Sequence, residues 1–353
     1  MRCIGSNLSN LPQKQTMTPK RLWGPRMLSE WKAIVAPSDP GYCNIRLADS
    51  SHPLDFRIGR DFHGYFIFQL DVECAEPKIL DLPKMSAVTC ELHQLTSGRS
   101  RLVLSLSDAA NFQNFALMCK SLMLATDKLA PTQSEKGLQQ AIKEVHRWQQ
   151  MLRHRANHLL SKSERIGLVG ELLFLRDILG NRIGWNAAIK SWNGPSGHEQ
   201  DFVVAGNIFE VKTQVVTADR RIRISSEDQL DAVQGRILLC NQGIAPLPAS
   251  ITTARTLNTI VSEIRNAFDK AGAGALELFE IALLEVGYQE EPEYNEESWV
   301  LVDRIFYEVS SEFPRIERSD LRPGIEKVSY SIRVSDCVPF IISHDEAFEG
   351  VEI

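Results

Sequence analysis

The stretch His198-Glu-Gln-Asp-Phe-Val-Val-Ala-Gly-Asn-Ile-Phe-Glu-Val-Lys-Thr213 decides the fold of this 353-residue chain. Two apolar runs, at 202–204 and 208–211, flank the turn-forming residues Ala205-Gly206-Asn207. Apolar runs on either side of such a turn predict a β-hairpin.

The alternation of side chains along a strand then arranges the polar residues of this hairpin. A turn with two central residues, either Ala205-Gly206 or Gly206-Asn207, places Asp201 and Glu210 on one face. Lys212 shares that face because it lies two residues beyond Glu210. Phe209 and Val211 point to the other face, into apolar packing.

Two carboxylates and an ammonium on one strand pair have a chemical use. Carboxylates hold Mg²⁺, which prefers oxygen ligands and retains several waters. The ion activates a water and neutralises a phosphodiester, and a neighbouring lysine orients that water or stabilises phosphate charge. The same spacing also fits a hairpin whose solvent face carries Asp201, Glu210 and Lys212 as solubilising charges. Spacing alone does not separate these readings.

The pattern Asp201-x8-Glu210-x-Lys212 resembles the motif of the PD-(D/E)XK nuclease superfamily, which has the restriction-endonuclease-like fold. More narrowly, the chain resembles a bacterial family of PD-(D/E)XK motif proteins encoded near restriction and phage-defence genes. The resemblance runs from about residue 161 to 230. It implies that Asp201 and Glu210 bind Mg²⁺, for which Mn²⁺ substitutes, and that Lys212 assists the attacking water. Gln200 stands where the motif name has proline.

A helix is predicted immediately before the hairpin. Ser161-Lys-Ser-Glu164 fits a capping box, and Gly180-Asn181 fits a stop, so the helix should span 162–179. Gly167 and Gly170 are poor helix formers. A close approach of the helix backbone to the sheet would explain both glycines.

Glu171 lies in the middle of this helix among apolar residues. A buried lone carboxylate is costly without a partner. Glu171 therefore either faces solvent between apolar stripes or points into the acidic cluster. The resemblance favours the second placement, in which Glu171 is a further metal ligand, directly or through water.

The chain as a whole predicts an α/β protein with more than one domain. We expect a partly disordered N-terminal segment (1–40), a β-rich domain (41–130), a linker at 130–137, a nuclease core (138–285) and an acidic, β-containing C-terminal subdomain (286–353). The core should be a mixed sheet flanked by helices, as in restriction-endonuclease-like folds.

The net charge of −6 is unevenly distributed. Residues 281–353 hold 17 acidic and 6 basic residues, which leaves the rest of the chain net positive. The acidic region could repel DNA, contact a partner or solubilise the chain. Basic residues before and after the hairpin form a candidate phosphate-contacting strip, and a solvated helix face explains them equally well. The strip consists of Arg147, Arg153, Arg155, Lys162, Arg165, Arg220, Arg221 and Arg223, with His154 and His158.

Other signals exclude several classes of protein. Seven scattered cysteines without a Cys-x-x-Cys pair favour reduced thiols over a zinc site or a disulfide framework. No apolar run is long enough for a transmembrane helix, and the first residues lack a signal-peptide core, so a cytoplasmic protein is expected. Phosphate-loop, zinc-protease and serine-hydrolase motifs are absent.

Two further positions have open interpretations. Ser225 and Gln229 could contact phosphate or hold the lysine, but Ser226-x-x-Gln229 also fits a capping box. His198 could assist proton transfer, although a lone loop histidine is more often incidental.

Together these features predict a Mg²⁺-dependent DNA endonuclease with Asp201, Glu210, Lys212 and Glu171 in its site. The resemblance implies a restriction or phage-defence setting, with methyltransferase and ATPase or helicase subunits as partners and a homodimer as one possible assembly. The alternative function is a non-cleaving scaffold or DNA-binding subunit that retains the nuclease fold.

Overall fold

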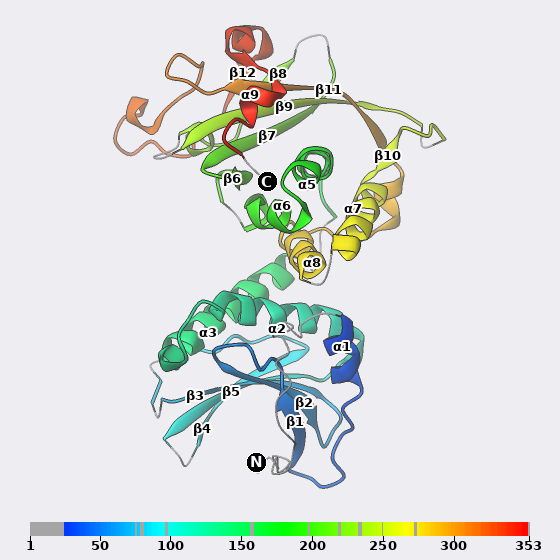
Figure 1. Cartoon of the computed structure of the whole chain (residues 1–353), viewed down its shortest axis with the longest axis vertical. Coiled ribbons are helices and arrows are strands. Elements are labelled where there is room, and N and C mark those ends of the chain that lie inside the picture. The colour runs from blue at the N-terminus through cyan, green and yellow to red at the C-terminus, as the bar shows by residue number, and fades with distance from the viewer. Residues whose placement is uncertain are drawn as a thin grey trace. The chain divides into compact units, whose positions relative to one another are not determined.

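The computed structural model describes residues 25–74, 76–77, 81–95, 98–155, 159–196, 198–217, 220–231, 235–248, 250–271 and 274–351. The chain divides into two compact units, residues 1–157 and 158–353, and each is described by itself (Figure 1). The expected disorder of the first 20 residues lies outside the described residues.

The N-terminal unit is built on a five-stranded sheet in which all neighbouring strands are antiparallel. Its order is β1-β2-β3-β5-β4. The strands are β1 (Cys43–Leu47), β2 (Asp55–Asp61), β3 (Phe66–Val72), β4 (Val88–Leu95) and β5 (Arg99–Leu106). The predicted β-rich region is confirmed.

Helices α2 (Phe112–Thr126) and α3 (Ser134–Arg155) cover one face of this sheet (Figure 1). The short helix α1 (Pro25–Lys32) joins them through Trp31, which is fully buried and packs against Phe66 and Phe112. Residues 25–32 are therefore part of the folded unit, although they fall in the segment expected to be partly disordered.

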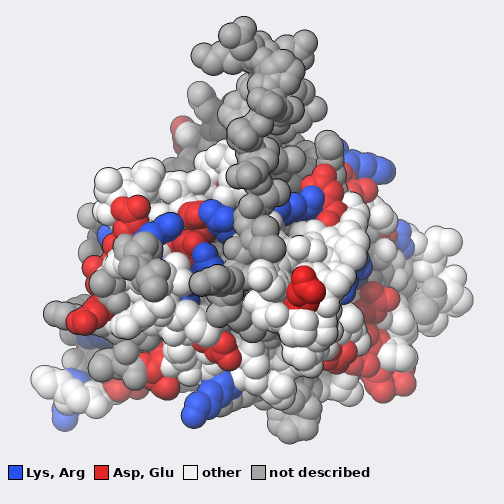
Figure 2. All heavy atoms as spheres, turned by 90° about the horizontal axis from the view of Figure 1, so that it is seen from below, with Lys and Arg blue, Asp and Glu red and all other residues white. Residues whose placement is uncertain are grey.

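The other face of the sheet is polar. Arg101 donates to Asp71 on the neighbouring strand, and Arg57 donates to Asp55. Figure 2, a view from below, shows basic and acidic side chains next to one another among the described atoms. The described atoms visible in this view therefore form no uniform basic patch.

The segment expected to be a linker is helical. Pro131–Gln133 form a 3-10 turn (η2) and Ser134 begins α3, so residues 130–137 connect two packed helices of one unit. The glycine and proline of this segment therefore mark a turn between two helices. The Gln133 side chain closes that turn by accepting the Ala130 N–H. The expected domain boundaries, as limits of independently folding pieces, stay a prediction.

The C-terminal unit is built on a mixed sheet of order β10-β11-β9-β7-β6, with β13 beside β11, and a separate ribbon of β8 and β12. The strands are β6 (Phe202–Val204), β7 (Asn207–Val215), β8 (Arg221–Ile224), β9 (Arg236–Pro246), β10 (Arg255–Thr256), β11 (Ser298–Glu308), β12 (Tyr330–Arg333) and β13 (Ile341–Ile342). β7 and β9 are parallel.

This sheet includes a strand from the expected C-terminal subdomain. Strand β11 pairs with β9 over most of its length, so residues from 286–353 complete the sheet that carries the hairpin. The sequence boundary at 286 did not anticipate this because strand pairing across about 60 residues leaves no local pattern. The predicted mixed sheet flanked by helices is confirmed.

Helices pack against one face of the sheet and the β8–β12 ribbon against the other (Figure 1). The helices are α4 (Lys162–Phe174), α5 (Gly180–Arg182), α6 (Trp185–Ser191), α7 (Leu257–Ala271), α8 (Ala275–Glu285) and the short α9 (His344–Ala347). Phe209 and Val211 enter the core on the helix side, whereas Ile208 joins Ile222 and Ile224 on the ribbon side. Both faces of β7 are therefore covered.

The predicted helix before the hairpin is present with its capping box. Ser161 Oγ accepts the Glu164 N–H, and the Glu164 carboxylate accepts the Ser161 N–H. The helix continues past the expected stop through a π-helical turn, Leu175–Leu179 (η3), and ends after Arg182. Gly180 therefore lies within the helix and not at its end. A Cβ at this position would lie 2.9 Å from the Trp185 ring, which explains the glycine. Gly184, with φ of +74°, provides the stop instead.

The two helix glycines have different explanations. A Cβ at Gly170 would lie 1.6 Å from Thr213 Oγ1 on β7, so the predicted close approach of helix and sheet is confirmed there. A Cβ at Gly167 would meet nothing within 4 Å, so close approach does not explain that residue. None of the described helices is long and apolar enough to cross a membrane.

Candidate metal centre

The hairpin forms with the two-residue turn Ala205-Gly206. Both residues have positive φ, +49° and +82°, as a type I′ turn requires. Phe202 pairs with Phe209, so the next pair outward is Asp201 and Glu210. These carboxylates therefore share a face, as the alternation predicted, and the Asp201 Oδ2 atom accepts the Val211 N–H at 2.7 Å.

The burial of this face decides against the solubilising interpretation. Glu210 is fully buried, and the side chain of Lys212 is only 18% exposed. The β8–β12 ribbon and the following turn cover that side of the sheet. Charges kept for solubility would lie in water, so these residues are buried for another reason.

Lys212 has two partners in the site. Its Nζ atom lies 2.7 Å from Glu210 Oε1 and donates to Gln229 Oε1 at 2.9 Å. The Lys212 ammonium lies within hydrogen-bonding distance of Glu210 Oε1, whereas Glu210 Oε2 has no hydrogen-bond donor among the described residues. A fully buried carboxylate with an unsatisfied oxygen is costly unless a cation or another donor completes it.

Glu171 points toward this cluster. Its Oε2 atom accepts the Trp192 Nε1–H at 2.7 Å, and Trp192 forms an antiparallel bridge with Phe202. The loop after Trp192 is fixed by two N–H groups, from Asn193 and Gly194, that donate to the Asp201 carbonyl.

Gly194 shows how near the two carboxylates are. A Cβ at this position would lie 2.9 Å from Glu171 Oε2 and 3.3 Å from Asp201 Oδ1, so both oxygens flank one point in space. A side chain at Gly194 would fill that space.

The electrostatics of the cluster show an excess of negative charge. Burial, followed by the Asp201 charge, raises the pKa of Glu171 to about 8. Burial likewise raises the pKa of Asp201 to about 6, against the opposing effect of Lys212. Glu210 also has a raised pKa, because of burial and then Asp201. For Lys212, burial lowers the pKa, but the charges of Glu210 and Asp201 outweigh it and raise the pKa.

The donor set fits a hard divalent cation. With all three carboxylates ionised, one ammonium would leave two negative charges uncompensated, which a divalent ion would balance and which the raised pKa values reflect in its absence. Within the described ranges, however, no three His, Cys, Asp or Glu side chains are grouped closely enough to hold a metal by themselves. Mg²⁺ is commonly held by one or two carboxylates, with waters and substrate phosphates completing its shell. Asp201 and Glu210 suffice for that, and Glu171 as a ligand stays a prediction.

The predicted basic strip is largely not free for phosphate. Arg220 makes a bidentate pair with Asp303, and Lys162 and Arg165 both bind Glu297. Arg147 pairs with Glu144 in the N-terminal unit. Arg221 and Arg223 are exposed on β8. The partners of Arg220, Lys162 and Arg165 are distant in sequence, so the sequence contains no sign of these ion pairs, and phosphate contact by the strip stays a prediction. The side chains of residues 153–155 and all of His158 lie outside the described residues.

The sequence predicts no role for Trp192, because no local signal marks its contact with Glu171. For Gln229 the sequence allows a cap or a contact with the lysine. Ser226 caps the turn, and the Gln229 oxygen accepts a hydrogen bond from Lys212. His198 lies exposed. Its proposed role gains no support from any contact among the described residues.

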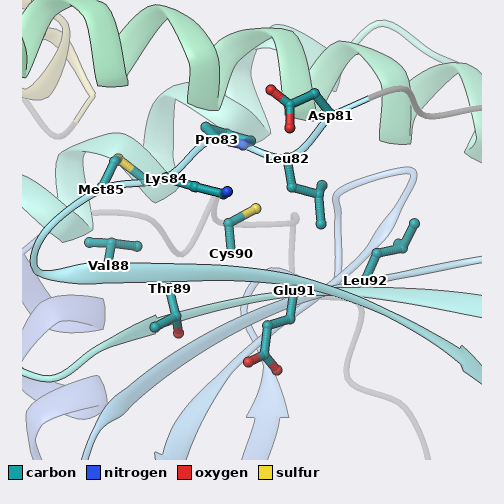
Figure 3. A pocket seen from close by; sticks show the side chains of 10 residues that line it. All are labelled: Asp81, Leu82, Pro83, Lys84, Met85, Val88, Thr89, Cys90, Glu91 and Leu92. Carbon is teal, nitrogen blue, oxygen red and sulfur yellow. The ribbon is translucent and has the colours of Figure 1, made fainter.

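A pocket in the N-terminal unit offers no comparable chemistry. It has a volume of about 560 Å³ and lies between residues 81–85 and strand β4 (Figure 3). Glu91 and Thr89 point to the opposite side of the strand from Cys90 (Figure 3). Burial raises the pKa of Cys90 to about 12, so its thiol is no nucleophile. The carboxylate cluster is therefore the better candidate site.

A comparison with protein-family models matches residues 27–335 to the family described as "Putative PD-(D/E)XK family member, (DUF4420)". No curated protein and no solved structure matches the chain.

Proposed function

Because the chain belongs to this PD-(D/E)XK family, we propose that it is a Mg²⁺-dependent endonuclease that hydrolyses phosphodiester bonds in DNA. The observation that carries the proposal is the fully buried Glu210, opposite Asp201 and beside Lys212, whose Oε2 atom has no hydrogen-bond donor among the described residues. A structural ion pair would be satisfied, whereas a metal ligand needs free oxygens.

Each residue has a part in the proposed reaction. Asp201 and Glu210 would hold the ion, which when bound lowers the pKa of a water and neutralises phosphate charge. Asp201 is fixed for this by the Val211 N–H. Lys212 offers a positive charge to the attacking water or to the phosphate. Glu171, held by Trp192, would bind a water of the ion, as an auxiliary ligand.

The setting of the reaction is a finer proposal. The resemblance to motif proteins of restriction and phage-defence loci supports a role against foreign DNA, in the cytoplasm, with ATPase, helicase or methyltransferase subunits as partners. The N-terminal unit would position substrate or partners. The acidic C-terminal residues act in part within the fold, since Asp303 and Glu297 bind basic residues of the same unit.

The direct test is cleavage of supercoiled plasmid by the full chain. Reactions with Mg²⁺, with Mn²⁺ and with EDTA are compared for the parent and for Asp201→Asn. We expect nicked or linear product only with a divalent ion and only from the parent. Equal cleavage by the variant would reveal a contaminant and remove support for the site.

A non-cleaving scaffold subunit is the second candidate. It is favoured by one observation, that Glu210 is closed off from solvent and already paired with Lys212. The thermal stability of the parent with and without Mg²⁺ separates the two, because an ion that binds only the folded state raises Tm. A scaffold would show DNA binding, no cleavage and no Mg²⁺-dependent rise in Tm.

A further inference from the structure

Gln229 is tied to the candidate site although it lies on a separate turn, Glu227–Leu230 (η5), after strand β8. Its Oε1 atom accepts two hydrogen bonds of 2.9 Å, one from Lys212 Nζ and one from the Ser225 N–H. Both partners are donors, so they fix which end of the amide is oxygen. The N–H₂ end therefore points away from these two groups.

The turn that carries Gln229 is firmly placed. The buried Glu227 carboxylate accepts the N–H groups of Lys327 and Val328. Gln200, the residue before Asp201, donates to the Asp228 carbonyl at 3.4 Å. The turn therefore contacts both the strand that holds Asp201 and the side chain of Lys212, which lets it set the position of the lysine relative to the carboxylates.

Several N–H groups remain available at this place. An ammonium has three N–H donors, and Glu210 and Gln229 are its two acceptors among the described residues. The amide N–H₂ of Gln229 has no acceptor among those residues. Both side chains are half-buried, so a ligand can reach them.

We propose that Gln229 is a positioning residue that holds Lys212 for the scissile phosphate, and that its N–H₂ group binds an oxygen of the same phosphate. This inference rests on the proposed function. An amide suits the role because its oxygen anchors the ammonium without adding a fourth negative charge to the cluster. A carboxylate at this position would repel the phosphate that Lys212 is placed to meet.

The competing explanation is that Gln229 only closes its own turn through Ser225. The chain offers a matched control, because Ser226 Oγ accepts the Asp228 N–H in the same turn and does not contact Lys212. Ser226→Ala removes one side chain–backbone hydrogen bond and leaves the lysine in place. A merely structural role for Gln229 predicts that both positions behave alike.

Two substitutions separate the roles of the two ends of the amide. Gln229→Met removes the acceptor and the N–H₂ group at similar volume, and Gln229→Glu keeps an acceptor for Lys212 but loses the N–H₂ group. The first readout is the rate of reductive methylation of Lys212, followed by peptide mass mapping against the exposed Lys190. The second readout is kcat and KM for plasmid DNA.

We expect Lys212 to be methylated about tenfold faster in Gln229→Met, the effect of losing one hydrogen bond to a charged group. Its rate should stay at the parental value in Gln229→Glu and Ser226→Ala. The kcat should fall by a similar factor in Gln229→Met, and KM should rise by roughly tenfold in Gln229→Glu. Ser226→Ala should leave kcat and KM unchanged.

Unchanged methylation in Gln229→Met would overturn the positioning role, whatever the cleavage results. Parental KM in Gln229→Glu would overturn the phosphate contact. A parent that cuts no DNA but shows the expected methylation pattern would refute the proposed function and the phosphate contact, and would support the placement of Lys212 by Gln229.

Discussion

Each of the two units contains a carboxylate–cation pair on a sheet, and the side chains of the two pairs are buried to nearly the same extent. In the N-terminal unit Asp71 faces Arg101 across β3 and β5, with side chains 3% and 17% exposed. In the C-terminal unit the values for Glu210 and Lys212 are 0% and 18%. Burial and charge therefore do not distinguish the two pairs.

The two pairs differ in the hydrogen bonds that their carboxylate oxygens accept. Both oxygens of Asp71 accept hydrogen bonds from Arg101, at 2.5 and 2.6 Å. Glu210 has the Lys212 contact at Oε1 alone, its Oε2 atom has no donor among the described residues, and Asp201 and Glu171 add like charge nearby. In an ion pair with a structural role, the carboxylate oxygens are hydrogen-bonded and the charges balance. A buried carboxylate that lacks a donor and has further negative charge beside it is a candidate for binding another ligand.

The largest difference between the pairs should appear when each cation is removed. We expect Lys212→Met to reduce plasmid cleavage by roughly 10²–10³-fold, because a charge aimed at the reacting phosphate is lost. Since Lys212 is largely buried beside Glu210, we expect the variant to be less stable as well. Cleavage at the parental rate would show that Lys212 has only a structural role, as is expected of Arg101.

The matched change in the N-terminal unit is Arg101→Met. Breaking a buried pair by removing one partner typically costs about 3–5 kcal/mol, and we expect a loss of that order in chemical denaturation. Cleavage by the protein that remains folded should not change. A variant of parental stability would show that Asp71 and Arg101 contribute little, and a specific loss of cleavage would give this pair a role in the reaction.

Glu171→Gln tests whether the excess charge in the C-terminal unit is functional. The amide oxygen can still accept the Trp192 N–H, so the fold around it should persist. Partners of metal-bound groups typically matter by roughly 10–100-fold. We expect activity to fall within that range and to recover in part at higher Mg²⁺ concentration. Undiminished activity across a Mg²⁺ titration would remove Glu171 from the site.

The dependence of stability on pH tests the raised pKa values of the cluster. In EDTA the folded chain retains protons on Glu171 (pKa about 8) and Asp201 (pKa about 6) that the unfolded chain releases near 4.5 and 3.8. The free energy of unfolding should therefore fall as pH rises from 5 to 8, by at most about 1.4 kcal/mol per pH unit for each retained proton.

Two comparisons make that pH experiment specific. Asp201→Asn should flatten the slope below pH 6 and Glu171→Gln should flatten it up to pH 8, whereas Arg101→Met should keep the parental slope. Mg²⁺ should raise stability more at pH 8 than at pH 5, because the ion competes with protons for the carboxylates. A parental slope that rises with pH would contradict the raised pKa values.

The sequence by itself determined what depends on short spacings. The hairpin, the shared face of Asp201 and Glu210, and the capping box at Ser161 were predicted, because alternation along a strand and helix capping act within a few residues. The sequence left the turn open between Ala205-Gly206 and Gly206-Asn207, and the structure has the first. The family resemblance added the roles that this spacing alone could not assign. It also favoured the inward placement of Glu171, which the contact with Trp192 supports.

Only the tertiary structure decided what surrounds those residues. The β8–β12 ribbon buries Glu210, and Gln229 binds Lys212 from 17 residues away. Strand β11 joins the sheet from beyond the expected boundary, and its Asp303 takes Arg220 out of the predicted phosphate strip. Such contacts join segments distant in sequence, and they depend on which surfaces the whole chain brings together, so no local pattern encodes them.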